Sequence, residues 1–208
     1  MSRQNTDSMT GMDMFKIVAN LMLIYIAGGL ILASVYAKTS PIIFKKAKQE
    51  KENALKEMIE ADSIKEMGEW YPYPRKHAEY YKATTDGKTV GYIIETFGKG
   101  YSSYINILVS VNTDLVVQKI NVLHHAETPG LGDEIEKDYF KDQFKGKTIE
   151  TLKVVKDGDL TYVQAISGAT ISSRAVTEAG VRPAVQMLSD ILSGKIKAET
   201  GKHGEEGH

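Results

Sequence analysis

The pattern of hydrophobic and polar positions divides the chain into a long apolar segment and a much longer mixed segment. Residues 17–37 are 21 consecutive positions without a charge, flanked by Lys16 and Lys38. A helix of that length extends about 31 Å, which matches the hydrocarbon thickness of a bilayer. The pattern therefore predicts a single N-terminal transmembrane helix.

A cleaved signal peptide is the alternative interpretation of this segment. Residues 33–37, "ASVYA", resemble a cleavage site with small residues. The apolar stretch is nevertheless longer than the core of a typical signal peptide, so a retained anchor is favoured.

The charges beside the span give a first indication of orientation. Arg3 and Lys16 precede the span, whereas five lysines follow it within residues 38–51. Cytoplasmic flanks carry the excess of lysine and arginine. Taken alone, the lysine count predicts that the large C-terminal part lies in the cytoplasm.

The segment after the span has a helical pattern. Pro41 predicts a break, and residues 42–66 are rich in Lys, Glu and Ala with apolar positions at helical spacing. This predicts an amphipathic helix with a solvated charged face. Residues 70–76, "WYPYPRK", predict a proline-broken loop.

Two hairpin patterns follow. Residues 78–96 contain two β-rich runs around Asp86-Gly87, and residues 104–125 contain two more around positions 112–114. Such runs joined by short turns predict β-hairpins. Consecutive hairpins predict an antiparallel sheet rather than a parallel βαβ arrangement.

The C-terminal third mixes one more hairpin pattern with a helix. Residues 149–167 predict a hairpin that turns at Asp157-Gly158, and residues 170–192 have an apolar helical face. Gly180 and Pro183 are expected to kink or interrupt this helix. The fold class is therefore α+β. The predicted parts are an N-terminal tail 1–16, a transmembrane helix 17–37, a helical stalk 38–74, a folded domain 75–193 and a polar tail 194–208.

Composition excludes several function classes. The net charge is −1, from 26 basic and 27 acidic residues, which disfavours nucleic acid as a partner. The chain has no cysteine, which excludes disulfides, thiol nucleophiles and cysteine-ligated iron–sulfur clusters. A redox role would therefore need an organic cofactor, or a metal held by histidine and carboxylate.

The first candidate for chemistry is residues 127–133, "ETPGLGD". Gly130 and Gly132 permit tight turns and a close approach of the backbone to a ligand. A loop that only joins a strand to a helix is the structural alternative, because the spacing matches no dinucleotide or P-loop motif. His124 and His125 precede the loop, and with Glu127 they are weak evidence for a metal site.

The second candidate is "SGAT", Ser167 to Thr170, at the predicted start of a helix. In the structural interpretation, a hydroxyl caps the helix. In the functional one, the free N–H groups of the helix start favour a phosphate, and a hydroxyl there contacts the phosphate or is esterified to it. Gly168 and Ala169 would leave room for a bulky group. A serine hydrolase is a poorer alternative, because the G-x-S-x-G elbow is missing.

Three segments in order carry a resemblance: residues 98–114, "GKGYSSYINILVSVNTD"; residues 125–135, "HAETPGLGDEI"; and residues 167–173, "SGATISS". Together they resemble the FMN-binding domain of the RnfG and NqrC subunits of ion-translocating respiratory complexes. The resemblance covers about residues 75–193, and the short chain is more similar to RnfG. Relatives often have Gly-Pro where this chain has "GKGYSS".

The resemblance implies a covalent cofactor. FMN would be attached by a phosphoester to Thr170, with Ser167, Gly168 and Ala169 around the phosphate, and Ser173 matches a family position that commonly carries a hydroxyl. The loop before the short helices would lie against the flavin. Its expected contacts are Glu127, Thr128, Gly130, Leu131 and Gly132.

The resemblance also implies a role. The chain would relay electrons among the other subunits of a membrane Rnf-type complex, after a flavin transferase attaches the FMN. The domain would lie on the extracytoplasmic side of the cytoplasmic membrane, against the lysine count. Two alternatives stay open: a membrane-anchored binding or scaffold module without flavin, and a tethered hydrolase acting through Ser167.

Overall fold

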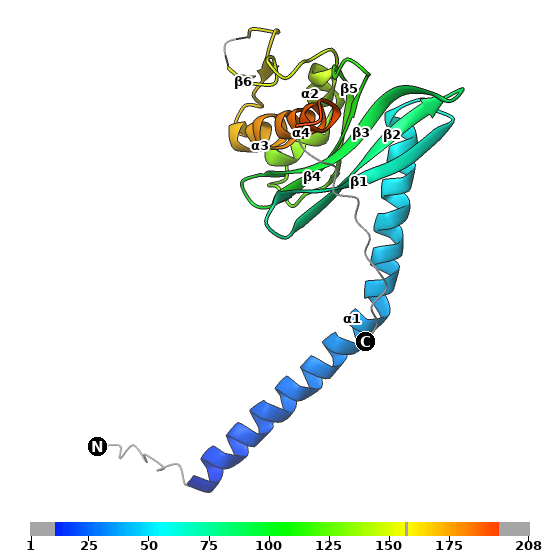
Figure 1. Cartoon of the computed structure of the whole chain (residues 1–208). Helices are drawn as coiled ribbons and strands as arrows, with labels where there is room; N and C mark the ends of the chain where they lie inside the picture. The colour runs from blue at the N-terminus through cyan, green and yellow to red at the C-terminus, as the bar shows by residue number, and fades with distance from the viewer. Residues whose placement is uncertain (1–10, 157, 196–208) are drawn as a thin grey trace. The chain divides into compact units, whose positions relative to one another are not determined.

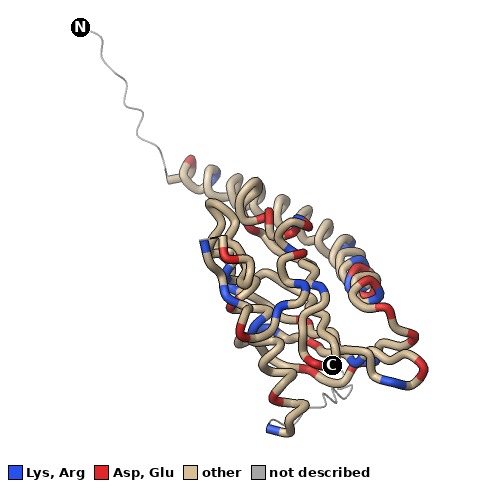
Figure 2. Tube along the Cα trace, turned by 90° about the horizontal axis from the view of Figure 1, so that it is seen from above, with Lys and Arg blue, Asp and Glu red and all other residues tan. Residues whose placement is uncertain are grey.

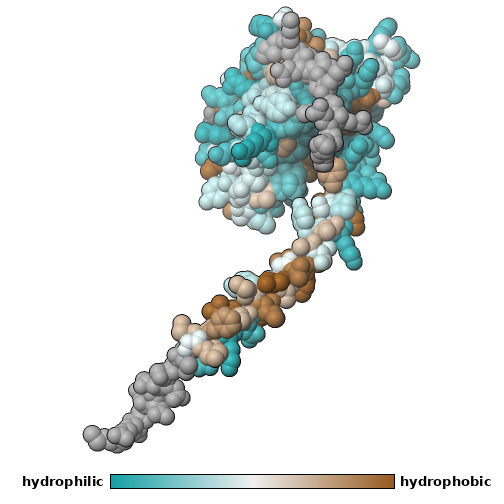
Figure 3. Space-filling model, turned by 60° about the horizontal axis from the view of Figure 1, so that its bottom comes forward, coloured by the Kyte–Doolittle hydropathy of each residue, from teal (hydrophilic) through white to brown (hydrophobic). Residues whose placement is uncertain are grey.

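The computed structural model describes residues 11–156 and 158–195, so the predicted tails lie largely outside the described residues. Two compact units, residues 1–49 and 50–208, divide the chain. Helix α1 (Gly11–Met58) runs through the first and into the second. By length and composition it is the one described helix able to cross a membrane, and Figure 3 shows apolar side chains gathered along it.

The break predicted at Pro41 is wrong, because Pro41 lies inside α1. Proline deprives a helix of one backbone hydrogen bond, but it does not end every helix that contains it. The strong helical segments on both sides of Pro41 continue the same helix.

A five-stranded antiparallel sheet forms the centre of the second unit within the described residues (Figure 1). Its strands follow chain order, as the hairpin patterns predicted. Asp86 and Gly87 both have positive φ, the geometry of a tight type I′ hairpin turn. The strands are β1 (Ser63–Tyr73), β2 (Lys76–Thr85), β3 (Lys88–Lys99), β4 (Tyr104–Val111) and β5 (Val117–His124).

Strand β1 corrects the sequence prediction of a helix to residue 66 and a loop at 70–76. Trp70 pairs with Ala78 and Tyr73 pairs with Lys76, so the "WYPYPRK" segment is mostly strand. Register shifts interrupt its alternation. An edge strand tolerates its proline, because one side of such a strand has no partner.

The hairpin predicted at residues 149–167 is also wrong. Strands β6 (Val154–Val155) and β7 (Val163–Gln164) pair in parallel. The segment between them forms local contacts instead of a tight turn: the Gly158 N–H donates to Gln164 Oε1 at 3.0 Å. Asp157 of the predicted turn lies outside the described residues.

Helical segments cover one face of the sheet (Figure 1). The helix predicted over 170–192 is present, and Gly180 lies in a π-helical interruption, as expected. Pro183 falls in the first turn of the following helix. The segments are η1 (Gly132–Glu136), α2 (Asp138–Lys141), η2 (Asp142–Phe144), α3 (Thr170–Val176), η3 (Thr177–Val181) and α4 (Arg182–Leu192).

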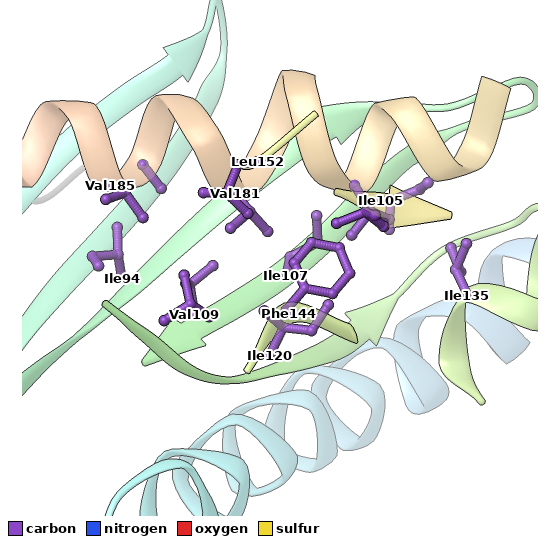
Figure 4. Packing of buried hydrophobic residues seen from close by; sticks show 14 of the residues in the cluster. Ile94, Ile105, Ile107, Val109, Ile120, Ile135, Phe144, Leu152, Val181 and Val185 are labelled. Atoms are coloured by element: carbon purple, nitrogen blue, oxygen red, sulfur yellow. The ribbon is translucent and has the colours of Figure 1, made fainter. Parts of the chain in front are cut away.

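The main core lies between the sheet and these helices. Ile94 and Val109 of the sheet face Val181 and Val185 of the helical layer (Figure 4). Helix α3 approaches β3 so closely that a Cβ at Gly98 would overlap the carbonyl of Ala175. This approach places the C-terminal end of α3 against the end of β3.

The opposite face of the sheet is covered by the last turns of α1. Leu55 and Met58 pack with Ile93 and Leu108 there. Beside this apolar cluster lies a charged one. Lys51 Nζ is 2.6 Å from Glu95 Oε2 and 2.8 Å from Glu79 Oε2. The two faces of the sheet are therefore covered by different elements: the helical segments of the C-terminal part on one face and the end of α1 on the other.

Candidate functional site

Three segments that are distant in sequence meet at the start of α3. They are the β3–β4 turn at residues 100–103, the loop at residues 127–132 and the "SGATISS" segment at residues 167–173. Each of them belongs to a segment that carries the family resemblance, and the carboxylate of Glu127 contacts the other two.

Glu127 is buried and accepts hydrogen bonds at both carboxylate oxygens. Three consecutive backbone N–H groups donate to it: Tyr101 at 3.0 Å, Ser102 at 3.0 Å and Ser103 at 3.1 Å. The Ser172 hydroxyl donates at 2.6 Å. Successive N–H groups that converge in this way form an anion-binding nest.

These donors determine the charge of Glu127. Burial alone would raise the pKa of the carboxyl group. The hydrogen bonds from Ser172 and from the N–H groups of residues 101–103 outweigh that effect and hold the pKa of Glu127 below its ordinary value. Glu127 is therefore an ionised, buried carboxylate at neutral pH.

Glycines allow this close packing. A Cβ at Gly132 would lie 2.7 Å from the Glu127 Cβ and 2.9 Å from Ser172 Oγ, and one at Gly100 would lie 2.5 Å from Glu127 Oε1. The close approach predicted at Gly132 is therefore an approach to the chain's own side chains. Gly130 has a φ of +73°, which is the turn conformation expected of it.

His125 holds the backbone of the same loop. Its Nδ1 accepts the Glu127 N–H at 3.1 Å, and its Nε2 lies 2.7 Å from Glu136 Oε1. Because Nδ1 accepts, Nε2 carries the hydrogen and donates to Glu136. His124 is exposed. The described part of the chain contains no group of three potential metal ligands among its His, Asp and Glu residues.

The start of α3 is closed without a side-chain cap, so the predicted capping role of Ser167 or Thr170 is wrong. Ala169 is the N-cap, and no side chain of the described residues caps it. Ser173 performs the closure from inside the helix. Its Oγ donates to the Ala169 carbonyl at 2.9 Å and accepts the Ile166 N–H at 3.0 Å.

The hydroxyls of "SGATISS" fall into two groups. Ser172 and Ser173 are buried and hydrogen-bonded. Thr170 is half-buried and Ser167 is exposed, and neither side chain has a hydrogen bond to another described residue. Thr170 is thus the hydroxyl that stands free at the first position of α3.

Small residues and an apolar side chain surround Thr170 along the chain. Gly168 has a φ of +77°, and a Cβ there would lie 3.0 Å from Leu131 Cδ2. Ala169 is buried, whereas Leu131 and Ile171 are exposed apolar side chains. The Glu127–Gly132 loop therefore lies against the "SGAT" turn. Its contact with a flavin stays a prediction.

The structure brings only part of the predicted set together. Glu127 and Gly132 contact Ser172, and Leu131 lies beside Gly168. Thr128 and Gly130 are exposed. Sequence reasoning missed Ser172 and His125 as structural partners of Glu127. In the sequence, Ser172 is visible only as the third hydroxyl of "SGATISS", and His125 only as a histidine two residues before Glu127.

Comparisons with known proteins identify the family of the chain. The model of the FMN-binding domain family matches residues 100–185. The G subunit of the proton-translocating ferredoxin:NAD(+) oxidoreductase complex of Clostridium ljungdahlii is 36% identical over 185 residues, covering 88% of this chain and 96% of that protein. The G subunit of the ion-translocating oxidoreductase complex of Methanosarcina acetivorans is 30% identical, covering 80% and 90%.

One solved structure similar to this chain is the C subunit of the Na(+)-translocating NADH-quinone reductase of Parabacteroides distasonis. It has a TM-score of 0.45 and 33% identity, and the match covers 56% of this chain and 61% of that one. The assignment follows from the nearly full-length match to the Clostridium ljungdahlii protein rather than from this partial likeness. The chain belongs to the RnfG family, the G subunits of ion-translocating oxidoreductase complexes, and it carries their FMN-binding domain.

Proposed function

We propose that this chain relays electrons through an FMN that is joined by a phosphoester to Thr170 Oγ1. The observation that carries the attachment point is the free Thr170 hydroxyl beside two engaged serines. The Clostridium ljungdahlii relative is part of a ferredoxin:NAD(+) oxidoreductase complex, which supports a place in such a complex, with other subunits as partners.

The residues around Thr170 fit a bulky phosphate-linked group. Gly168 and Ala169 add no large side chain to the turn, and Thr170 Oγ1 needs to break no bond with a described residue before it reacts. The exposed apolar side chains of Leu131 and Ile171 offer surface to a flat aromatic ring. When bound, FMN supplies one- and two-electron transfer, while the protein supplies position and electrostatics.

Each part of the turn has a task in this proposal. Ser173 and the Ala169 carbonyl hold the first turn of α3 in shape. The ionised Glu127 holds the two neighbouring loops. A covalent link removes the need for a deep pocket, so the flavin can remain open to its redox partners. A flavin transferase is required as a partner to catalyse the step: Thr170 Oγ1 would lose its proton and displace a nucleoside monophosphate from the flavin phosphate of a flavin dinucleotide.

Intact-mass spectrometry of the chain produced together with a flavin transferase tests the attachment. We expect one FMN adduct on the wild type and on Thr170→Ser, and none on Thr170→Ala. Ser167→Ala is the matched control, since Ser167 is also an unbonded hydroxyl in the same turn. An adduct that persists in Thr170→Ala would disprove the attachment point.

Flavin fluorescence of the denatured chain on a gel separates the relay from its alternatives. A scaffold module without flavin predicts a dark band. A hydrolase predicts labelling of Ser167 by a serine-directed acylating probe, and the described residues give Ser167 no hydrogen-bonding base. A fluorescent wild-type band that is lost in Thr170→Ala supports the relay over both.

We also propose that the domain lies on the extracytoplasmic side of the membrane, which the resemblance supports and the lysine count opposes. The chain contains no cysteine, so a single Asp114→Cys variant in an exposed turn provides a clean probe. We expect a membrane-impermeant thiol reagent to label it in spheroplasts and not in inverted vesicles. The reverse pattern would place the domain in the cytoplasm.

A further inference from the structure

Glu127 is a buried anion that forms no ion pair with any lysine, arginine or histidine among the described residues. Its charge is balanced by the N–H groups of Tyr101, Ser102 and Ser103 and by the hydroxyls of Ser172 and Ser103, the latter at 3.4 Å. Backbone donors cannot swing away as a lysine can. The position of the carboxylate and the conformation of the 100–103 turn therefore determine each other.

The network joins segments that are distant along the chain. Tyr101 precedes Glu127 by 26 positions, and Ser172 follows it by 45. Ser103 adds a second link, because its Oγ accepts the Ala126 N–H at 2.8 Å. The Glu127 N–H is held by His125, so the main chain and the side chain of Glu127 are fixed independently.

Both carboxylate oxygens are fully engaged by the chain itself. Oε1 accepts from Ser102 and Ser103, and Oε2 accepts from Tyr101 and Ser172. Ser172 lies two residues after Thr170 on the same helical turn. A displacement of the carboxylate would therefore release the start of α3 from the two loops beside it.

We infer that Glu127 is a positioning residue and not a ligand of the flavin: its carboxylate holds the acceptor turn of Thr170 against both neighbouring loops. The inference rests on the proposed attachment at Thr170, and it reinterprets Glu127 among the expected flavin contacts. Misplacement of a reacting group by about 1 Å can slow a reaction by about a hundredfold, so such a residue affects the attachment from a distance.

Two variants separate the parts of the network. Glu127→Gln keeps the shape of the side chain but replaces one acceptor oxygen with an NH₂ group that faces N–H or O–H donors. Ser172→Ala removes the link to α3 and leaves the nest of residues 101–103 intact. Glu134→Gln is the matched control, because Glu134 is a nearby acid in η1 whose contact is the outer residue Tyr139.

Hydrogen exchange on the full chain without flavin tests the positioning directly. Loss of a charge-assisted acceptor should speed exchange of the 101–103 amides by about tenfold in Glu127→Gln. The amides of α4 should keep their wild-type rates, as should every site in Glu134→Gln. Equal acceleration in α4 would show a general loss of stability and overturn the inference, as would unchanged exchange at residues 101–103.

The rate of FMN attachment by a transferase, followed by intact mass, provides the second readout. We expect a decrease of about tenfold or more in Glu127→Gln and a smaller one in Ser172→Ala. Wild-type rates in both variants would overturn the inference. If the wild type accepts no FMN, the proposed function fails, and the exchange measurement still decides the role of Glu127. If Glu127→Gln does not fold, the rate of FMN attachment to Ser172→Ala decides whether the bond between Glu127 and α3 positions Thr170.

Discussion

The domain buries two glutamates to the same extent and stabilises them by different means. Glu95 is 5% exposed and Glu127 is 6% exposed. Glu95 accepts from Lys51 at 2.6 Å and from Asn106 at 2.9 Å, on the face of the sheet covered by the end of α1. Glu127 accepts from backbone N–H groups and a serine, at the start of α3.

The different hydrogen-bond donors of Glu95 and Glu127 indicate different structural roles for the two carboxylates. At Glu95 one side chain from α1 supplies the counter-charge, so the ion pair fixes a helix to a sheet that is already formed by its own ladder. At Glu127 the N–H donors belong to the four-residue turn between β3 and β4, and they lie beyond the last ladder pair, Lys99 and Tyr104. A buried carboxylate there orders the turn itself. Basic and acidic residues are mixed over the folded domain (Figure 2), and these two acids stand apart by their burial.

The titration behaviour of the Lys51 cluster follows from its contacts. Burial by itself would lower the pKa of Lys51, but Glu95 and Glu79 raise it above its ordinary value. Burial would raise the pKa of Glu79, but its bonds with Lys51 and Tyr81 lower it. Burial and Glu79 together raise the pKa of the Tyr81 phenol. Lys51 and Glu79 are therefore charged at neutral pH, and the Tyr81 phenol is neutral.

The largest expected effect comes from removing the lysine. Lys51→Met leaves two carboxylates, one of them fully buried, without their counter-charge, and we expect a loss of about 3 kcal/mol in unfolding free energy. Denaturant unfolding of the full chain measures it. Lys56→Met, on an exposed position of the same helix, should change little.

A double variant sharpens this result. Lys51→Met combined with Glu95→Gln removes the stranded charge and should recover a large part of the loss. If the single and double variants are equally unstable, the ion pair is not what fixes the end of α1 to the sheet.

Removing the charge at the other cluster should cost less. Glu127→Gln retains the shape of the side chain and some of its acceptor capacity, and we expect a loss of about 2 kcal/mol. The same denaturant measurement, with Glu134→Gln beside it, provides the comparison. A loss larger than that of Lys51→Met would reverse the ranking of the two clusters.

Elements with a clear pattern over a few neighbouring residues could be predicted from the sequence. Elements whose pattern is irregular or very short could not. The β2–β3 and β4–β5 hairpins were predicted because alternation and the Asp86-Gly87 turn lie within a few residues of one another. Strand β1 was missed because its register shifts and Pro72 disguise the alternation. Strands β6 and β7 have two residues each, too short for any periodic pattern.

The candidate site was predictable as a set of segments but not as a network. Residue types and order indicated Thr170 and the Glu127 loop. The bonds of Glu127 to Tyr101 and Ser172 join positions 26 and 45 apart, and no local pattern records them. Helix capping by Ser167 or Thr170 was expected from local chemistry, and two hydrogen bonds of Ser173, four and seven positions away, replaced it.

A smaller effect is expected at Ser172. Ser172→Ala removes one hydrogen bond to an anion and leaves the three N–H donors in place, so a loss of about 1 kcal/mol is expected. Thermal or denaturant unfolding detects it. A loss equal to that of Glu127→Gln would mean that Ser172, rather than the nest of residues 101–103, supplies most of the stabilisation.

The smallest expected effect is a difference in how the free energy of unfolding changes as the pH falls. The direction of this change distinguishes the Glu127 cluster from the Lys51 cluster. The lowered pKa of Glu127 means that its contribution is present above the ordinary value of 4.5 and is lost as pH falls through the lowered pKa. The raised pKa of Lys51 leaves its own protonation unchanged in acid, since its contribution is lost only in alkali. The lowered pKa of Glu79 likewise makes its contribution disappear in acid, but by the same amount in the wild type and in Glu127→Gln.

The wild type should therefore lose stability more steeply than Glu127→Gln below pH 4.5, by about 0.5 kcal/mol per pH unit, because protonation of one group is spread over a wide range. Unfolding curves across this acid range measure both slopes. Identical slopes would mean that Glu127 does not enter the native structure as an anion, and the contrast between the two glutamates would then rest on geometry alone.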